Sequence, residues 1–182
     1  MADSTVTSSS LNDNKDLRQS LGTESVSRQI KCGIDKKLFS LEFSLAYEEQ
    51  IEAWKKAANE GDTGAQVQLG LCYYHGDGVF KDLEEAVKWF RKAAEKGNAE
   101  AQCRLGLCFD AGAGVLQDKM EAAEWYRKAA EQGHSDAMHL LGDSYYFGWG
   151  VPKDEEAAAK WLQKAEEHGH DSAVHLLSRI KG

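Results

Sequence analysis

The chain has 182 residues and a formal net charge of −8, and 42% of its residues are hydrophobic, which is enough for one domain with a buried core. The acidic balance argues against general nucleic-acid binding, because no basic face is available to neutralise phosphates. No apolar run approaches the ~20 residues of a membrane-spanning helix, so we expect no membrane partner.

The N-terminus shows none of the usual targeting features. It lacks a basic start followed by an apolar core, Asp3 and Asp13 appear early, and the first basic residue is Lys15. These features argue against secretory and mitochondrial presequences and favour a cytoplasmic or nuclear location. A bacterial effector exported by a specialised machine would share them.

Residues 1–36 are expected to form a disordered tail. Ten of the first 28 residues are Ser or Thr, and apolar residues are sparse. Such a segment buries too little surface to offset its chain entropy. The tail is either a solvated linker or carries a short binding or phosphorylation motif, around residues 11–21 or 25–28.

Residues 37–64 are predicted to form an atypical N-terminal capping helix. The apolar residues of segment 38–47 fit the period of a helix and that of a strand, so both remain open there. Residues 47–61 align with the second half of the repeated unit that follows, with Trp54 displaced by one position. The expected sealing residues are Phe43, Tyr47, Ile51 and Trp54.

A 36-residue unit then recurs without gaps, in residues 65–100, 101–136 and 137–172. A fixed period of this length is the signature of a stacked repeat array. Residues 173–182 begin a fourth unit and stop. They are predicted to form a C-terminal capping helix, either a thin cap or, if Leu176 or Ile180 is exposed, an edge for weak self-association.

Each unit is predicted to be a helical hairpin. The spacing of its first apolar residues suits one face of a helix, and a Gly-x-Gly turn follows. An aspartate then caps the second helix, with Glu85 and Glu121 completing capping boxes, and a glycine ends it. The capping residues are Asp82, Asp118, Asp154, Gly97, Gly133 and Gly169. The tryptophans of the second helices, Trp89, Trp125 and Trp161, are predicted to be core.

The pattern A-x-x-x-L-G-x-x-Y/F-x-x-G-x-G-V-x-x-D-x-x-x-A-x-x-W-x-x-K-A-x-x-x-G, present three times in residues 65–172, resembles the Sel-1-like repeat, a relative of the tetratricopeptide repeat. The resemblance implies an all-α, right-handed α/α solenoid of stacked helical hairpins that serves as a protein–protein interaction scaffold or adaptor. It supplies no catalytic residues. Cysteine-rich relatives suggest a β-lactamase-like hydrolase as an alternative, but the second helices here contain no cysteine.

Cysteine and histidine are the candidate reactive residues. No C-x-x-C pair exists, and Cys72 and Cys108 lie one helix spacing apart, about 8–10 Å, which is too wide for a disulfide. They are predicted to be small buried residues. His139 and His175 share a column with Cys103, which suggests a metal or pH-sensing site as a further alternative, with Asp143 one turn after His139.

Successive side chains of this column lie about one helix spacing apart, which is wide for ligands of one metal ion, so we expect no metal and no cofactor. His134, His168 and His170 lie where the second helices end, and we expect imidazolium there to suit the negative end of the helix dipole. No Ser-His-Asp order, phosphate loop or H-E-x-x-H motif is present. The protein is therefore predicted not to be an enzyme.

The candidate site is a concave groove lined by the first helices. By analogy with tetratricopeptide proteins, the third, seventh and tenth positions of each unit face inward, and these columns vary while the framework columns repeat. The groove is expected to bind an extended or helical segment of another protein, with Tyr74 and Tyr146 as anchors. The predicted partner-binding residues are Val67, Leu71, Tyr74, Cys103, Leu107, Asp110, His139, Asp143, Tyr146, Trp149, His175 and Arg179.

Overall fold

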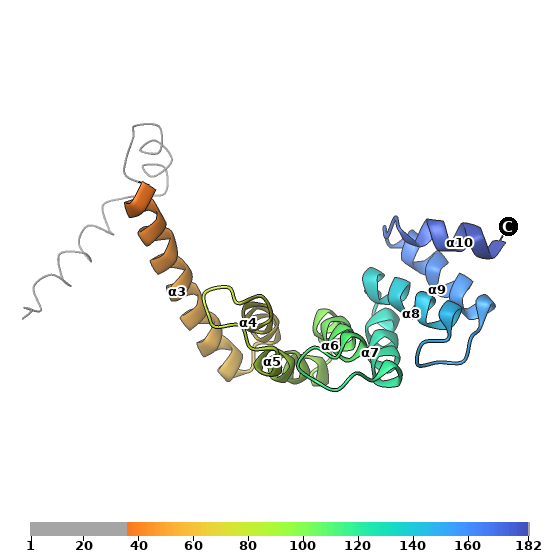
Figure 1. The fold of residues 1–182 in the computed structure, drawn as a ribbon, viewed down its shortest axis with the longest axis horizontal. Coiled ribbons are helices and arrows are strands. Elements are labelled where there is room, and N and C mark those ends of the chain that lie inside the picture. The colour runs from red at the N-terminus through yellow and green to blue at the C-terminus, as the bar shows by residue number, and fades with distance from the viewer. Residues whose placement is uncertain (1–35, 182) are drawn as a thin grey trace, which may run out of the picture. The chain divides into compact units, whose positions relative to one another are not determined.

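The computed structural model describes residues 36–181, and every regular element in that range is a helix (Figure 1). Side chains are described for residues 47–173 and 175–180. The predicted tail, with Cys32, and the side chain of Phe43 lie outside these ranges. The helices are α3 (Lys36–Glu60), α4 (Thr63–His75), α5 (Leu83–Glu95), α6 (Ala99–Ala111), α7 (Lys119–Glu131), α8 (Ser135–Phe147), α9 (Glu155–Glu167) and α10 (Ala173–Lys181).

The repeats belong to one unit of the chain, Tyr47–Gly182. In it α4 pairs with α5, α6 with α7, and α8 with α9, and each hairpin packs on the next through its second helix (Figure 1). This is the predicted all-α solenoid of stacked hairpins. Neither helix of a pair could bury its apolar face alone, so the array depends on contacts between neighbouring repeats.

Segment 38–47 is helical, so the strand alternative is wrong. Further along α3, Ile51 is 2% exposed and packs in a cluster with Leu69 and Trp89, and Tyr47 and Trp54 cover that cluster. The hydroxyl oxygen of Tyr47 also lies 3.9 Å from Sγ of Cys72 in α4. The three described members of the predicted seal therefore contact the first repeat.

The predicted starts and ends of the second helices are confirmed, whereas α3 ends at Glu60 and α4 begins at Thr63, both within the predicted capping segment 37–64. The side chain of Asp82 accepts a hydrogen bond from the backbone N–H of Glu85 at the start of α5, and Asp118 and Asp154 do the same for α7 and α9. Gly97, Gly133 and Gly169 follow the second helices with positive φ. Sequence and structure agree here because caps are local interactions.

The predicted capping boxes are wrong. Their second half requires a glutamate side chain to bond the N–H of the capping aspartate, but that N–H donates to a carbonyl of the preceding helix. The bonds run from Asp82 to Tyr73 at 2.9 Å, from Asp118 to Phe109 at 3.0 Å and from Asp154 to Tyr145 at 2.9 Å. This backbone bond closes each hairpin, and Glu85 pairs with Lys88 instead.

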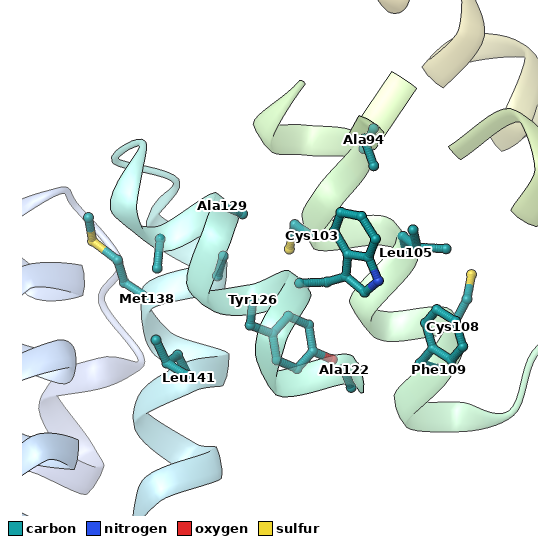
Figure 2. Close-up of a cluster of buried hydrophobic side chains, with 14 of the residues drawn as sticks. Ala94, Cys103, Leu105, Cys108, Phe109, Ala122, Tyr126, Ala129, Met138 and Leu141 are labelled. Atoms are coloured by element: carbon teal, nitrogen blue, oxygen red, sulfur yellow. The ribbon is translucent and has the colours of Figure 1, made fainter. Parts of the chain in front are cut away.

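The core lies between first and second helices and continues from repeat to repeat (Figure 2). Gly106 of α6 allows α6 and α7 to approach closely, because a Cβ there would lie 2.6 Å from the ring of Tyr126 in α7.

The predicted core residues are largely buried. Trp89 and Trp125 are buried as predicted, and Trp161 is half-buried. Cys72 and Cys108 are free, buried thiols, as predicted. Each tryptophan also carries the ammonium of a lysine three residues later over its ring, at 3.8, 3.8 and 4.4 Å.

Successive repeats also contact one another through their turns. A Cβ on Gly114 would overlap the carbonyl of Leu83 at the start of α5, and one on Gly150 would overlap the carbonyl of Lys119. Only glycine can bring the backbone this close, so Gly114 and Gly150, the second glycines of their turns, seat the second and third repeats on the repeat before.

Helix α10 closes the C-terminal side of the array. Leu176 and Leu177 are buried, and Ile180 is half-buried against the same core. Leu176 is therefore not exposed, because α10 packs on α9 and turns this residue inward. The thin cap and the self-associating edge were the two alternatives, and the burial of Leu176 agrees with the thin cap.

Candidate partner-binding face

The exposed and half-buried side chains of the first helices α4, α6, α8 and α10 form what we call the first-helix face. Three of the twelve predicted contact residues do not belong to it, because Trp149 lies in the turn after α8 and two others are buried. Val67 is 4% exposed and Cys103 is 3% exposed, and both lie in the hydrophobic core. Third-position residues point toward the neighbouring repeat when they are small and apolar, so these two offer almost no surface to a partner.

The apolar part of the first-helix face centres on the seventh-position column. Leu71 is half-buried against the core, and Leu107 is 36% exposed. Tyr74, the predicted anchor in α4, is half-buried and meets the ring of His75 edge-on, with centroids 5.1 Å apart. This part offers aliphatic and aromatic surface without a formal charge.

The polar part continues on α8 and α10. Asp143 and His139 are half-buried, and His175 and Arg179 are exposed. The guanidinium of Arg179 lies 6.0 Å from the ring centroid of Tyr146, so the second predicted anchor already has a cation over it. Asp110 of α6 is paired with Lys119 at 2.6 Å and is not free for a partner.

Trp149 lies in the turn of the third repeat and is 45% exposed. Its ring stacks on Phe147, with centroids 4.5 Å apart and planes at 20°, and the ammonium of Lys119 lies 5.1 Å from its centroid. The sequence analysis missed Phe147. It also missed Phe80, Leu116 and Met120, which are exposed near the turns. For Phe80 and Leu116 the signal was an apolar residue two positions before the capping aspartate, where a loop is normally polar.

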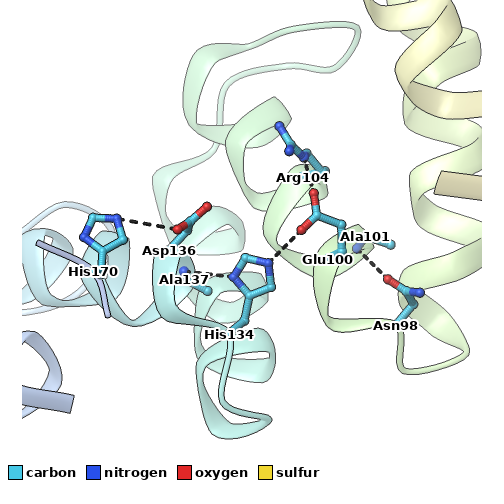
Figure 3. Close-up of polar contacts among 8 residues, drawn as sticks. All are labelled: Asn98, Glu100, Ala101, Arg104, His134, Asp136, Ala137 and His170. Atoms are coloured by element: carbon cyan, nitrogen blue, oxygen red, sulfur yellow. Dashed lines mark hydrogen bonds and ion pairs between the residues drawn. The ribbon is translucent and has the colours of Figure 1, made fainter. Parts of the chain in front are cut away.

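A row of side chains caps the first helices and links successive repeats (Figure 3). Asp62, Asn98 and His134 are the N-caps of α4, α6 and α8, and each accepts a backbone N–H bond, at 2.7, 2.9 and 3.3 Å. His134 thus caps the start of α8, and the prediction of an imidazolium at the end of α7 is wrong for it. The prediction failed because α7 ends at Glu131 and α8 begins at Ser135, so His134 lies close to the end of one helix and the start of the next.

The tautomer of His134 follows from its two contacts. Its Nδ1 accepts from the N–H of Ala137, so the ring proton is on Nε2, which lies 2.8 Å from Oε2 of Glu100. His134 therefore donates to a carboxylate of the preceding repeat while it caps its own helix.

Glu100 is held as an anion. The hydrogen bond from His134 is the main cause that lowers its pKa to about 2, and Nε of Arg104 donates to its other oxygen at 2.6 Å. Both oxygens of this carboxylate are thus engaged, one across the repeat junction and one within α6.

The next junction carries a second histidine and a second acid. Nε2 of His170 lies 3.5 Å from Oδ1 of Asp136, and the His170 ring stacks on His139 with centroids 4.4 Å apart. Nε2 of His139 in turn lies 3.7 Å from Oδ2 of Asp143. His168, by contrast, bonds the carbonyl of Lys164 at the end of α9 through Nδ1 at 2.9 Å, as a residue suited to a helix C-terminus does.

Burial sets the ionisation of the His139–Asp143 pair. It lowers the pKa of His139 and raises the pKa of Asp143, because both charged forms are poorly solvated there. His139 Nδ1 and Asp143 Oδ1 are buried and unpartnered within the described part of the chain. Among residues 47–173 and 175–180, no group of three His, Cys, Asp or Glu side chains could hold a metal ion.

A pocket of about 230 Å³ opens between α6 and α8. It lies where His134, His139 and His170 meet the exposed side of the first helices. Its lining residues are Glu100, Cys103, Arg104, Leu107, His134, Asp136, His139, Leu140 and His170.

Comparison with protein families matches the Sel1 repeat three times, in residues 63–98, 99–134 and 135–170. The chain belongs to the Sel1 repeat family. The three Sel1 ranges begin at the first residues of α4, α6 and α8, two residues before the sequence-based units. Proteins of the Sel1 family are typically non-enzymatic helical repeat scaffolds.

Solved structures of other Sel1 repeat proteins resemble this one. A Sel1 repeat protein from Oxalobacter formigenes is 40% identical with a TM-score of 0.68, over 72% of this chain and 54% of that one. The protective antigen c5321 of uropathogenic Escherichia coli strains, which displays an SLR fold, is 34% identical with a TM-score of 0.72, over 88% of this chain and 36% of the antigen. Helicobacter pylori cysteine rich protein B is 27% identical with a TM-score of 0.57, over 70% and 96%.

The match thus spans about half of the Oxalobacter protein and about a third of c5321. Comparison with curated proteins gives no match. Within residues 36–181 of this Sel1 repeat protein, no helix is long and apolar enough to cross a membrane.

Proposed function

We propose that this Sel1 repeat protein is an interaction scaffold that binds a segment of another protein along its first-helix face. Sel1 repeat proteins are generally scaffolds for protein–protein interaction. One observation about this chain carries the proposal. The framework columns repeat and are buried, whereas the seventh-position column changes from Leu71 and Leu107 to Asp143 and Arg179 and stays at least partly accessible.

A column that varied for packing reasons alone would be buried, and one that varied without constraint would be polar throughout. This column is instead apolar at one end and charged at the other, which suits a segment whose own side chains change along its length. Tyr146 adds an aromatic ring beside the charged end, and aromatic residues are enriched among the contacts that dominate binding energy.

The hydrolase alternative is not proposed. Burial raises the pKa of Cys103 to about 12 and that of Cys108 to about 11, so neither thiol is a ready nucleophile at neutral pH. The histidine alternative, which rested on the column of Cys103, His139 and His175, is not proposed either, because Cys103 is buried and His139 stacks on His170 instead.

The test begins with random peptides displayed on phage and selected on the full chain. The selected peptides are then measured against a variant that carries Leu71→Glu, Leu107→Glu and Tyr146→Glu. Leu116→Glu is the matched control, because Leu116 is 91% exposed on a turn and lies outside the first-helix face. Circular dichroism confirms that each variant stays helical.

We expect peptides that bind the wild type and the Leu116→Glu control with equal affinity and lose binding to the triple variant. Undiminished binding to the folded triple variant, or loss on Leu116→Glu alone, would overturn the proposed face.

A further inference from the structure

We propose that the pocket between α6 and α8 receives a lysine or arginine side chain of the bound segment. The inference rests on the proposed function, since it names the chemistry that one position of the partner must have. It concerns the junction of the second and third repeats, where the apolar part of the first-helix face gives way to the polar part.

The inner wall of this pocket suits the aliphatic stem of a long side chain. Leu107 and Leu140 face it from α6 and α8, and the neutral thiol of Cys103 lies between the helices. Lysine and arginine commonly lay their methylene groups along such surfaces while the charged end stays solvated. The volume of about 230 Å³ is on the scale of one side chain, so the pocket fits a single residue of a partner.

The charges at the rim favour a cation over an anion. Glu100 and Asp136 are the two carboxylates of the lining, and Arg104 is its one formal cation. Arg104 donates to Glu100 at 2.6 Å and is largely neutralised by it. The side chain of Asp136 is 62% exposed, and Nε2 of His170 lies 3.5 Å from its Oδ1. Most of this carboxylate therefore remains open to solvent and can attract a cation.

Two histidines of the lining, His134 and His139, do not reverse this balance, and the third, His170, is the neighbour of Asp136 named above. His134 is neutral while its Nδ1 caps α8, and its one ring proton is already donated to Glu100. His139 is desolvated, which favours its neutral form. Asp143 lies behind His139 and adds further acidic character. An anionic partner group would meet the carboxylates of Glu100 and Asp136, and the guanidinium that could receive it, that of Arg104, is already paired with Glu100.

The preceding junction does not repeat this chemistry. Gly64, Gln68 and Asn98 occupy the positions that correspond to Glu100, Arg104 and His134. There the Asn98 amide reaches only the hydroxyl of Thr63, at 3.4 Å. A cationic residue is therefore expected at one register of the partner, beside apolar residues that meet Leu71 and Leu107.

The experiment titrates the isotopically labelled full chain with small probes and follows backbone and imidazole signals by NMR. The probes are N-acetylarginine methylamide, N-acetyllysine methylamide, and N-acetylcitrulline methylamide, which has the shape of arginine but no charge. N-acetylglutamate methylamide tests for an anion site. We expect saturable shifts at Leu107, His134 and His139 with the two cations, several-fold tighter than with citrulline, and weakening with added salt.

Two variants and a matched control locate the interaction. Glu100→Gln and Asp136→Asn each remove one carboxylate of the pocket, and Glu124→Gln removes an exposed carboxylate of α7 outside it. We expect each pocket variant to weaken the arginine probe by roughly two- to fivefold, the range of a partly exposed ion pair, while Glu124→Gln leaves it unchanged.

Equal affinity for citrulline and arginine, tighter binding of the glutamate probe, or shifts confined to residues outside the pocket would overturn the inference. Selected phage peptides separate this failure from that of the proposed function. Peptides that bind the first-helix face without any shared lysine or arginine would leave the scaffold role intact and remove the cation pocket. Peptides that avoid the face altogether would remove both.

Discussion

Nε2 of His134 lies 2.8 Å from Oε2 of Glu100, so the contact joins the N-cap of α8 to α6 of the hairpin before it. The same imidazole caps α8 through Nδ1. One side chain therefore sets where a helix begins and how that helix is attached to the hairpin before it.

The double role of His134 predicts unequal effects for two substitutions. His134→Ala removes the cap and the contact with Glu100, and should lower the free energy of unfolding by about 1–2 kcal/mol. His134→Asn should cost less, because Asn98 shows that asparagine caps the equivalent helix. Urea denaturation followed by circular dichroism measures both. Equal losses would mean that the cap contributes nothing.

Glu100 should stabilise the fold at neutral pH and cease to do so in acid. Its pKa is lowered to about 2, so its contribution is fully present above the unfolded value of about 4.3 and is lost as the pH falls toward about 2. The difference in unfolding free energy between wild type and Glu100→Gln should therefore shrink over that interval. In His134→Asn, the Glu100 pKa measured by carbon-detected NMR should move back toward its usual range. A constant difference between the two proteins across the acid range would contradict this account of Glu100.

His139 should also make the folded protein less stable when the pH falls, but at a higher pH than Glu100 does. Burial lowers its pKa, although Asp143 and Asp136 favour the charged form and His170 disfavours it. The unfolded chain takes up the proton below about 6.5 while the folded chain resists it, so stability falls as the pH drops through this region. His139→Gln should flatten the dependence of the melting temperature on pH between neutral and mildly acidic buffers. An unchanged slope in the variant would show that His139 does not cause the loss.

Gly106 should be intolerant of even one added methyl group. A Cβ there would lie 2.6 Å from the Tyr126 ring, so Gly106→Ala should destabilise the protein by about 1–3 kcal/mol despite the better helix propensity of alanine. Tyr126→Ala removes the obstacle, and Gly106→Ala should cost less in that background. Additive losses in this double-mutant cycle would show that the two residues do not compete for space.

Local chemistry explains which features the sequence predicted. Asp82 accepts from an amide three residues away, and Gly97 adopts its positive φ for the helix just before it, so both follow from neighbours in the chain. The 36-residue period predicted the stacking because each hairpin needs a neighbour. The hydrogen bond of the Asp82 N–H could not be predicted in this way. Its acceptor is the carbonyl of Tyr73 in the preceding helix, and not the side chain of the expected glutamate.

The candidate site was less predictable, because it depends on packing between repeats. Cys103 and His139 share a column and line the same pocket, yet the first is 3% exposed and the second is half-buried and stacks on His170. Their different size and polarity, together with the residues of the next repeat, decide how far each is exposed. The contact of His134 with Glu100 spans 34 positions, and no local pattern indicates it.

The most direct test of the scaffold role maps where a selected peptide contacts the labelled full chain, by amide chemical-shift changes. We predict changes concentrated in α4, α6 and α8, with Leu71, Leu107 and Tyr146 among the largest. Changes concentrated instead on α5, α7 and α9, or on the exposed turn residues Phe80 and Leu116, would contradict the assignment of the first-helix face as the binding surface.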